Sequence, residues 1–174
     1  KMLDLTVKNE QSPSIVQISG GEPTIHPDFF EVLDLAKQRP IQHLLVNTNG
    51  IKIATEPGFA ERLAKYCPGF EVYLQFDSLK LNPLQLLRGA DLRKIHQQAL
   101  DKLNQLSIPT TLVMTVRKGV NDDEMGDVID FALKQPCVRG VTFQPVQAAG
   151  RLKKYQQGFN ANRDRITLKE VRRK

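Results

Sequence analysis

Short apolar, β-rich runs alternate with longer amphipathic stretches along most of this 174-residue chain. The runs that we expect to be strands cover residues 14–19, 43–47, 71–76, 110–116 and 140–146. Helical periodicity lies between them, at residues 28–37, 57–66, 91–106 and 123–134. Strands separated by helices of this length indicate βα units, whose strands pair in parallel. The alternation therefore predicts an α/β fold with a mainly parallel sheet.

The expected strands become polar on one face toward their carboxyl ends. Because side chains alternate across a strand, Tyr73, Gln75 and Asp77 share one face, and Val72 and Leu74 share the other. The same pattern is repeated by Gln17 and Ser19, Asn47 and Asn49, Thr115 and Arg117, and Thr142 and Gln144. In a parallel barrel, inward polar groups near the carboxyl ends converge on one cavity. We expect this cavity to be the functional site; the alternative is that these residues only begin each loop.

The strongest local signal is the segment SGGEPT at residues 19–24, directly after the first expected strand. Its two adjacent glycines allow a tight turn and a close approach of the backbone to a ligand. Glu22 places a carboxylate at the strand end, where it would suit an ammonium group. The segment lacks the lysine and the spacing of the phosphate-binding pattern GxxxxGK(S/T) and of the dinucleotide-binding pattern GxGxxG. Taken alone, it could also be an ordinary turn.

Three segments, in this order along the chain, resemble the radical S-adenosylmethionine (radical SAM) enzymes. Residues 19–24 resemble the family's glycine-glycine-glutamate motif after the second barrel strand, and residues 46–50 (VNTNG) resemble its third-strand segment. Residues 116–122 (VRKGVND) resemble the fifth-strand segment that the family shares with molybdenum-cofactor biosynthesis protein A. The resemblance implies a partial (β/α)6 radical SAM barrel of parallel strands, from which the first strand and the cluster loop are missing.

Further segments are similar to the branch that contains tetraether-lipid synthase and dihydropterin methylase. They are residues 73–77 (YLQFD), Leu87-Arg88-Gly89, and residues 143–146 (FQPV) followed by Gly150-Arg151. The resemblance runs from about Ser14 to Arg151. It implies a small-molecule substrate of a lipid or pterin-like kind, whose identity these motifs do not reveal.

The resemblance also implies where S-adenosylmethionine (SAM) is bound. The cofactor-binding residues would be Gly20, Gly21, Glu22, Pro23, Asn49, Asp77, Ser78, Arg117, Gln144 and Val146. Glu22 and the glycine backbone would bind the methionyl ammonium group, and Arg117 would bind the methionyl carboxylate. Asp77 or Ser78 would contact a ribose hydroxyl. The segment from Gln144 to Val146 would line the adenine, and no residue is predicted to be catalytic or to bind a metal.

Simpler interpretations of the same residues stay open. Asp77 could only start a turn, and Asn49 and Gly50 form a common turn pair. Arg117 could only pair with a nearby acid, Asp122 or Asp123.

Radical SAM enzymes hold a 4Fe-4S cluster, usually with three cysteines in a CxxxCxxC loop. This chain has two cysteines, Cys67 and Cys137, and neither belongs to such a pattern. We expect both to be buried structural thiols. The resemblance then implies a truncated protein, whose longer parent would cleave SAM at the cluster and make a 5′-deoxyadenosyl radical. The chain by itself is expected to be inactive.

The net charge of +6 is concentrated at the carboxyl end. Residues 151–174 contain nine Lys or Arg and two Asp or Glu, whereas residues 1–150 contain 16 Lys or Arg and 17 Asp or Glu. We therefore predict a truncated barrel at residues 1–150 and a basic extension at residues 151–174. In the extension, Thr167 to Glu170 are predicted to form a capping box that begins an incomplete helix. A basic run of this kind is usually a solvated face, so no nucleic-acid partner is expected.

No apolar run approaches the length of about 18 residues that a membrane span needs, and no signal peptide is recognisable, so a cytoplasmic location is expected. The exposed edge of an incomplete barrel could pair with a second copy. Two alternatives to radical SAM function stay open. One is a metal-free barrel enzyme in which Glu22 and Asp77 act as acid and base. The other is a non-catalytic binding module that uses the basic tail.

Overall fold

The structure, a computed structural model, describes residues 1–147 and 160–171. Its centre is a five-stranded sheet whose strands follow one another in sequence order. The strands are β1 (Ile15–Ile18), β2 (His43–Thr48), β3 (Phe70–Gln75), β4 (Thr110–Val116) and β5 (Val138–Pro145). All neighbouring strands are parallel. The expected α/β fold is confirmed, and the ends of each expected strand are shifted by no more than two residues.

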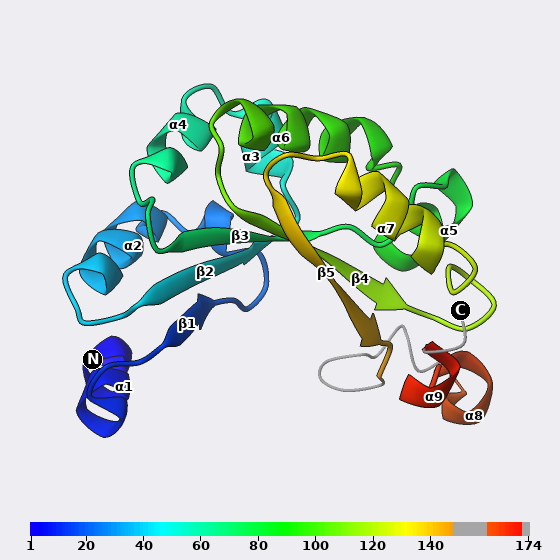
Figure 1. Cartoon of the computed structure of the whole chain (residues 1–174), viewed down its shortest axis with the longest axis horizontal. Coiled ribbons are helices and arrows are strands. Elements are labelled where there is room, and N and C mark those ends of the chain that lie inside the picture. Colours follow the sequence, from blue (N-terminus) through cyan, green and yellow to red (C-terminus); the bar gives the residue numbers. More distant parts are fainter. Residues whose placement is uncertain (148–159, 172–174) are drawn as a thin grey trace.

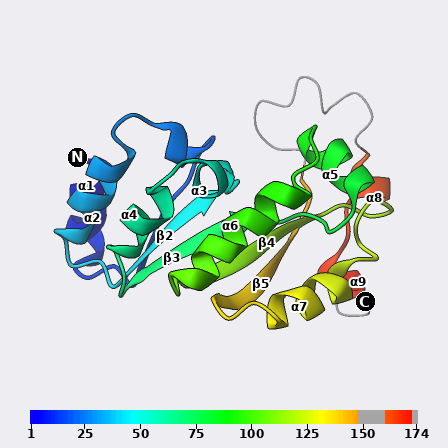
Figure 2. The ribbon, with the colours of Figure 1, turned by 90° about the horizontal axis from the view of Figure 1, so that it is seen from above.

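Helices cover one face of this sheet (Figures 1 and 2). They are α2 (Phe29–Lys37), α3 (Ile51–Thr55), α4 (Phe59–Ala64), α5 (Leu81–Arg88), α6 (Arg93–Gln105) and α7 (Met125–Leu133). The helix α1 (Met2–Glu10) precedes β1, and the 3-10 helix η1 (Pro23–Ile25) follows it. The short helices α8 (Ala161–Asp164) and α9 (Leu168–Val171) lie beside the carboxyl ends of β4 and β5 (Figure 1).

Some helix limits differ from the expected ones for local reasons. The helix expected at residues 57–66 begins at Phe59, because Gly58 has a φ of 76° and stands before the first helical residue. The helix α1 was not expected, since its sequence has no marked apolar stripe; in the structure none of its side chains is buried. The helix α5 has only eight residues and was likewise not expected.

The side chains between the helices and the sheet are apolar and buried. Burial alternates along β2 and β3, so that Leu44 and Val46 of β2 and Val72 and Leu74 of β3 face the helices. Leu100 of α6 belongs to the same core cluster. Burial of these apolar faces is the dominant favourable term in folding.

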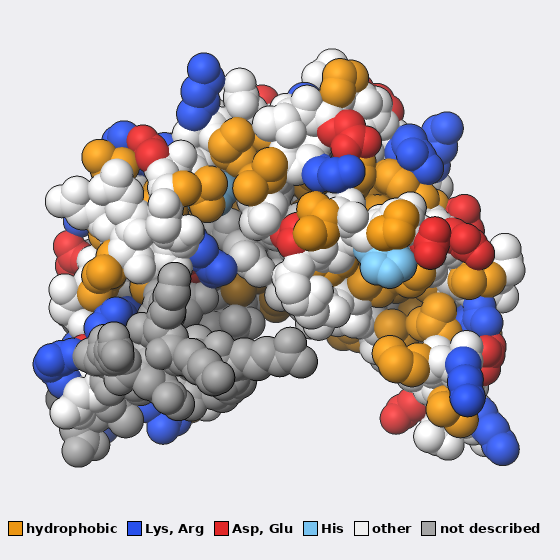
Figure 3. Space-filling model, turned by 180° about the vertical axis from the view of Figure 1, so that it is seen from behind, with side chains coloured by type: hydrophobic (Ala, Val, Ile, Leu, Met, Phe, Trp, Pro, Cys, Tyr) orange, Lys and Arg blue, Asp and Glu red, His pale blue; other side chains and the backbone are white. Residues whose placement is uncertain are grey.

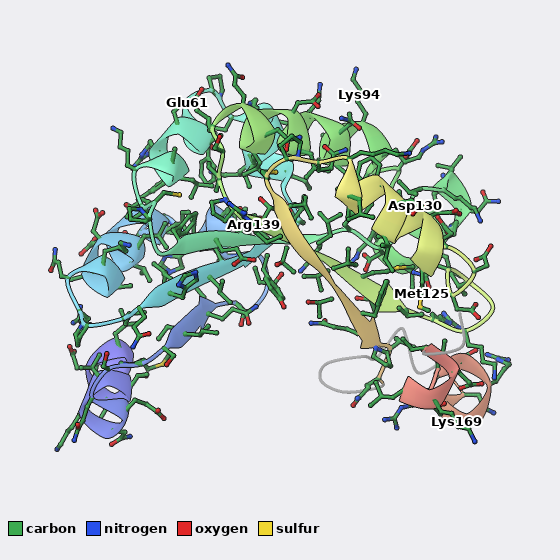
Figure 4. All side chains as sticks on the ribbon, in the orientation of Figure 1. Glu61, Lys94, Met125, Asp130, Arg139 and Lys169 are labelled. Carbon is green, nitrogen blue, oxygen red and sulfur yellow. The ribbon has the colours of Figure 1, made fainter. Side chains whose placement is uncertain are left out.

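The outer side of the helical layer is charged. Lys94 of α6 and Glu61 of α4 are exposed, and Lys94 points away from the sheet at the top of Figure 4. Within residues 1–147 and 160–171, no helix is long and apolar enough to cross a membrane.

Both cysteines lie at the amino ends of strands. Cys67 precedes β3 and is half-buried, and Cys137 precedes β5 and is buried. Burial raises the pKa of both thiols. A raised pKa makes a thiol less reactive as a nucleophile near neutral pH.

The expected capping box is present at the start of α9. The Thr167 backbone N–H donates to Glu170 Oε2 at 2.8 Å, and the Glu170 backbone N–H donates to Thr167 Oγ1 at 3.3 Å. Ile166, next to the box, is 1% exposed and joins the core, so this segment is packed against the body of the molecule. The remaining parts of the basic extension, residues 151–159 and 172–174, lie outside the described residues.

We predict that Leu100→Ala will lower the free energy of unfolding by about 2–5 kcal/mol, because it leaves a cavity between α6 and the sheet. Leu133→Ala is the matched control, since Leu133 of α7 is 81% exposed, and its effect should stay within about 0.5 kcal/mol. Urea unfolding followed by circular dichroism measures both. Equal losses in the two variants would contradict the assignment of the core to this layer.

Candidate functional site

The sequence-predicted site residues follow the ends of neighbouring parallel strands. Glu22 comes after β1, Asn49 after β2, Asp77 and Ser78 after β3, and Arg117 after β4, while Gln144 lies near the end of β5. Because all five strands run in the same direction, these residues share one edge of the sheet. This is the arrangement that a common site requires.

The double-glycine turn after β1 is open on its outer side. Gly20 has a φ of 109° and Gly21 a φ of 56°, in the region that favours glycine. A Cβ added at either position would meet no atom within 4 Å. The backbone of this turn is therefore accessible to a ligand.

The Glu22 carboxylate ties this turn to the end of β2. Its Oε1 accepts hydrogen bonds from the Thr24 backbone N–H at 3.2 Å, from Thr24 Oγ1 at 2.6 Å and from Thr48 Oγ1 at 2.7 Å. Its Oε2 accepts from the Asn49 backbone N–H at 2.7 Å. A carboxylate oxygen has about two lone pairs, so Oε2 can accept one more donor. Thr24 and Thr48 were not singled out as functional, because a lone threonine in a motif carries no signal of its partner.

Asn49 and Gly50 form the turn that leads into α3. Asn49 Oδ1 accepts from the Ile51 backbone N–H at 2.9 Å, and Gly50 has a φ of 78°. A Cβ at Gly50 would approach Leu74 Cδ1 to 2.6 Å, so this turn packs closely on β3. The turn interpretation describes this pair, and a cofactor contact of Asn49 stays a prediction.

The side chains of Asp77 and Ser78 are each 1% exposed and bonded to protein groups. Asp77 Oδ1 accepts from the Thr115 backbone N–H at 2.8 Å, and Oδ2 forms an ion pair with Arg88 Nε. Ser78 Oγ donates to the Glu124 carboxylate at 2.8 Å. Their predicted contacts with a ribose hydroxyl therefore stay predictions.

Arg117 pairs with an acid that is distant in the sequence. Its Nη2 lies 3.3 Å from Asp164 Oδ2 of α8, whereas the simpler interpretation had named the nearby Asp122 or Asp123. Bonds from Arg163 and from the Asn160 backbone hold the pKa of Asp164 well below its usual range. The Arg117 Nε is buried and has no hydrogen-bond partner among the described residues. A buried donor without an acceptor is unfavourable, so this atom would gain from an anionic ligand.

The face of the sheet opposite the helices carries hydroxyl and amide groups. The Tyr73 hydroxyl and Thr142 Oγ1 are 2.8 Å apart across β4, and Gln75 Nε2 donates to Asn47 Oδ1 at 3.3 Å. Val113 of β4 lies between Gln75 and Thr142 in the register and is 3% exposed. Figure 3, a view from behind, shows that the molecule is hollowed on this lower side. We call these four uncharged side chains the neutral floor; the same face also carries Glu71, whose carboxylate accepts from Thr111 Oγ1.

The last predicted contacts lie on and just after β5. Gln144 is exposed, and Val146 is half-buried, with its backbone N–H donating to the Val116 carbonyl at 2.9 Å. Gly150 and Arg151 lie outside the described residues. The assignment of this segment to the adenine stays a prediction.

His96 of α6 lies behind the turn that follows β3. It is 2% exposed, its ring centre is 5.0 Å from that of Phe76, and neither ring nitrogen has a hydrogen-bond partner in the described part of the chain. A cavity of about 130 Å³ adjoins the ring. Burial lowers the pKa of His96 to about 4, while the charge of Asp77 acts in the opposite direction. His96 is therefore neutral at pH 7.

Metal ligands do not gather in the described part of the chain. No group of three or more His, Cys, Asp or Glu side chains is found there in an arrangement that could hold a metal ion.

Residues 4–132 match the family model described as Radical SAM superfamily. The chain is 33% identical over 154 residues to the 7,8-dihydro-6-hydroxymethylpterin dimethyltransferase of Methanocaldococcus jannaschii, covering 87% of this chain and 30% of that protein. It is 34% identical over 121 residues to the probable GTP 3′,8-cyclase of Pyrococcus abyssi, covering 68% of this chain and 37% of that protein. The chain thus spans about a third of the length of these relatives.

Solved structures share the fold at low sequence identity. A domain of pyruvate-formate lyase-activating enzyme from Bacteroides vulgatus matches with a TM-score of 0.63 and 19% identity, covering 83% of this chain and 89% of that domain. The structure described as native anSMEcpe with bound AdoMet and Cp18Cys peptide matches with a TM-score of 0.66 and 17% identity, covering 92% of this chain and 46% of that one.

We predict that stability falls between pH 7.5 and 5 through His96. The folded-state pKa of about 4 lies below the ordinary value of 6.5, so the unfolded chain binds more protons in this range. The free energy of unfolding should therefore decrease by about 2 kcal/mol as the pH falls to 5. Urea unfolding across this pH range measures the decrease.

His96→Phe should remove this part of the pH dependence, whereas His43→Phe should retain it because His43 is exposed. If both variants follow the pH profile of the parent chain, His96 is not the responsible group.

Proposed function

The chain belongs to the radical SAM superfamily, and from this we propose that it forms the SAM-binding part of an enzyme that cleaves SAM at a 4Fe-4S cluster to give a 5′-deoxyadenosyl radical. The family resemblance drawn from the sequence motifs is confirmed by the family match and by the dihydropterin and GTP cyclase relatives. When bound, SAM supplies the 5′-deoxyadenosyl group with which the family abstracts hydrogen.

The observation that carries this proposal is the open double-glycine turn, which Glu22 fixes to β2. The methionyl end of SAM has an ammonium and a carboxylate group. Glu22 Oε2 has room for one further donor and would accept from the ammonium group, together with backbone carbonyls of the turn. Arg117 Nε needs an acceptor, and a carboxylate would provide it. The described residues therefore fit the methionyl end of SAM.

The residues of this chain do not fit the cluster. Its only two cysteines, Cys67 and Cys137, lie at the amino ends of strands, whereas the proposed site lies at the carboxyl ends. Burial also raises the pKa of both thiols. We therefore propose that the cluster ligands belong to a longer parent protein and that the 174-residue chain alone is inactive.

The geometry favours this function over a metal-free acid and base pair. Glu22 already accepts hydrogen bonds from three residues, and Asp77 is buried in an ion pair with Arg88. Neither carboxylate is arranged to exchange protons with a substrate. A cytoplasmic location, the absence of a nucleic-acid partner and self-association through the barrel edge stay predictions.

We propose a small-molecule substrate of the pterin class. Similarity to the dihydropterin dimethyltransferase extends over 87% of this chain. The neutral floor offers amide and hydroxyl groups that can hydrogen-bond to the ring nitrogen and carbonyl groups of a pterin.

We predict that Gly21→Ala will weaken SAM binding at least tenfold, because the added Cβ would occupy the open space in which the methionyl end of SAM would lie. Gly58→Ala is the matched control, since Gly58 also has a positive φ and open space, but lies between α3 and α4. Both variants should lose about 1–2 kcal/mol of stability through backbone strain. Isothermal titration of the 174-residue chain with SAM measures affinity. Absence of SAM binding by the unsubstituted 174-residue chain, or equal weakening in both variants, would refute the site.

We expect the cluster ligands to lie upstream of this chain in the longer parent protein. The reading frame upstream of Lys1 should encode a CxxxCxxC segment, and the longer protein should acquire an iron-sulfur chromophore on anaerobic reconstitution. It should then cleave SAM to 5′-deoxyadenosine, whereas the 174-residue chain should not. An upstream frame without this cysteine pattern would remove the cluster from the proposal.

A further inference from the structure

Asn121 joins the ends of β3 and β4 through its side chain. Its Nδ2 donates to the Asp77 carbonyl at 2.7 Å and to the Thr115 carbonyl at 2.9 Å. Its Oδ1 accepts from the Arg117 backbone N–H at 2.8 Å. Both donor positions of the amide are thus used, and the oxygen fixes the backbone of Arg117.

Glu124 makes a second connection between the same two segments. Its carboxylate accepts from Ser78 Oγ at 2.8 Å and from the Leu79 backbone N–H at 3.0 Å. Asn121 and Glu124 are both 0% exposed. Because they are fully buried, neither can touch a ligand in the hollow or at the edge of the sheet. We call these two residues and their bonds the β3–β4 clasp.

We propose that Asn121 and Glu124 are positioning residues for the cofactor site. They fix the turn at Asp77 and Ser78 against the start of the loop at Arg117, and so set how far apart these groups stand. The inference rests on the proposed function, since it assigns the clasp to the same SAM site.

The chemistry of the clasp explains why these residue types are needed. Two carbonyl oxygens, that of Asp77 after β3 and that of Thr115 in β4, meet at one point, and a side chain with two N–H donors can bind both. Replacing the Asn121 amide by a carboxylate would set oxygen against oxygen at this point. The strand ends would then separate, and buried carbonyls would lose their partners.

The test compares the same substitution at the two ends of the sheet. Asn121→Asp is paired with Asn104→Asp as the control. Asn104 donates to Gln135 Oε1 at 2.8 Å and accepts from the Cys137 backbone N–H at 3.0 Å, near the amino end of β5. SAM affinity of the 174-residue chain is measured by isothermal titration, and the urea midpoint is measured for each variant.

We expect both variants to have lowered urea midpoints, but only Asn121→Asp to weaken SAM binding, by at least tenfold. A folded Asn121→Asp variant that binds SAM with an affinity within twofold of that of the unsubstituted chain would overturn the inference, as would equal weakening in both variants. If the unsubstituted 174-residue chain does not bind SAM, the proposed function itself is wrong, and so is the inference.

A second pair of variants keeps the inference testable if Asn121→Asp does not fold. Glu124→Ala removes the acceptor for Ser78 and Leu79 and should weaken SAM binding at least fivefold. Glu124→Gln retains one oxygen for Leu79 and places an amide near Ser78 Oγ, so it should restore affinity to within about twofold of the parent chain. Unchanged affinity in Glu124→Ala would overturn the inference.

Discussion

The alternation of side chains across five parallel strands is the constraint on which the rest of the structure depends. Leu44, Val46, Val72 and Leu74 must face the helices, because they supply much of the buried apolar surface of the sheet. Their burial leaves the intervening side chains no other direction than the opposite face. A shift of one residue in the register would exchange the two faces. The core therefore determines where the polar groups lie.

Patterns that extend over a few residues could be predicted from the sequence. Such local patterns depend only on residues that are near one another in the sequence. They include the strands, the helices α6 and α7, the glycine turn and the capping box of Thr167 and Glu170. The polar face was predicted for the same reason, since the period of two along each strand is visible in the sequence. The motif resemblance added the family, which the comparisons bear out.

Partners that are distant in the sequence could not be predicted. Glu22 bonds to Thr48, Arg117 pairs with Asp164, and Asn121 reaches the Asp77 carbonyl. Such contacts depend on which strands become neighbours and on how far each loop extends, and a single polar side chain carries no periodic signal of either. The motifs identified the segments that meet at the site. They did not reveal that most polar groups at the candidate site are hydrogen-bonded to other groups of the protein.

If the neutral floor contacts the substrate, as proposed, recognition and stability depend on opposite faces of the sheet. Its side chains bond to one another in pairs, Tyr73 with Thr142 and Gln75 with Asn47, rather than to the helical layer. Exchanging one of them for another uncharged residue would leave the apolar face of the sheet unchanged and would cost little folding energy. Evolution can therefore adapt this scaffold to different small molecules by replacing the alternate residues of neighbouring strands whose side chains face away from the helices.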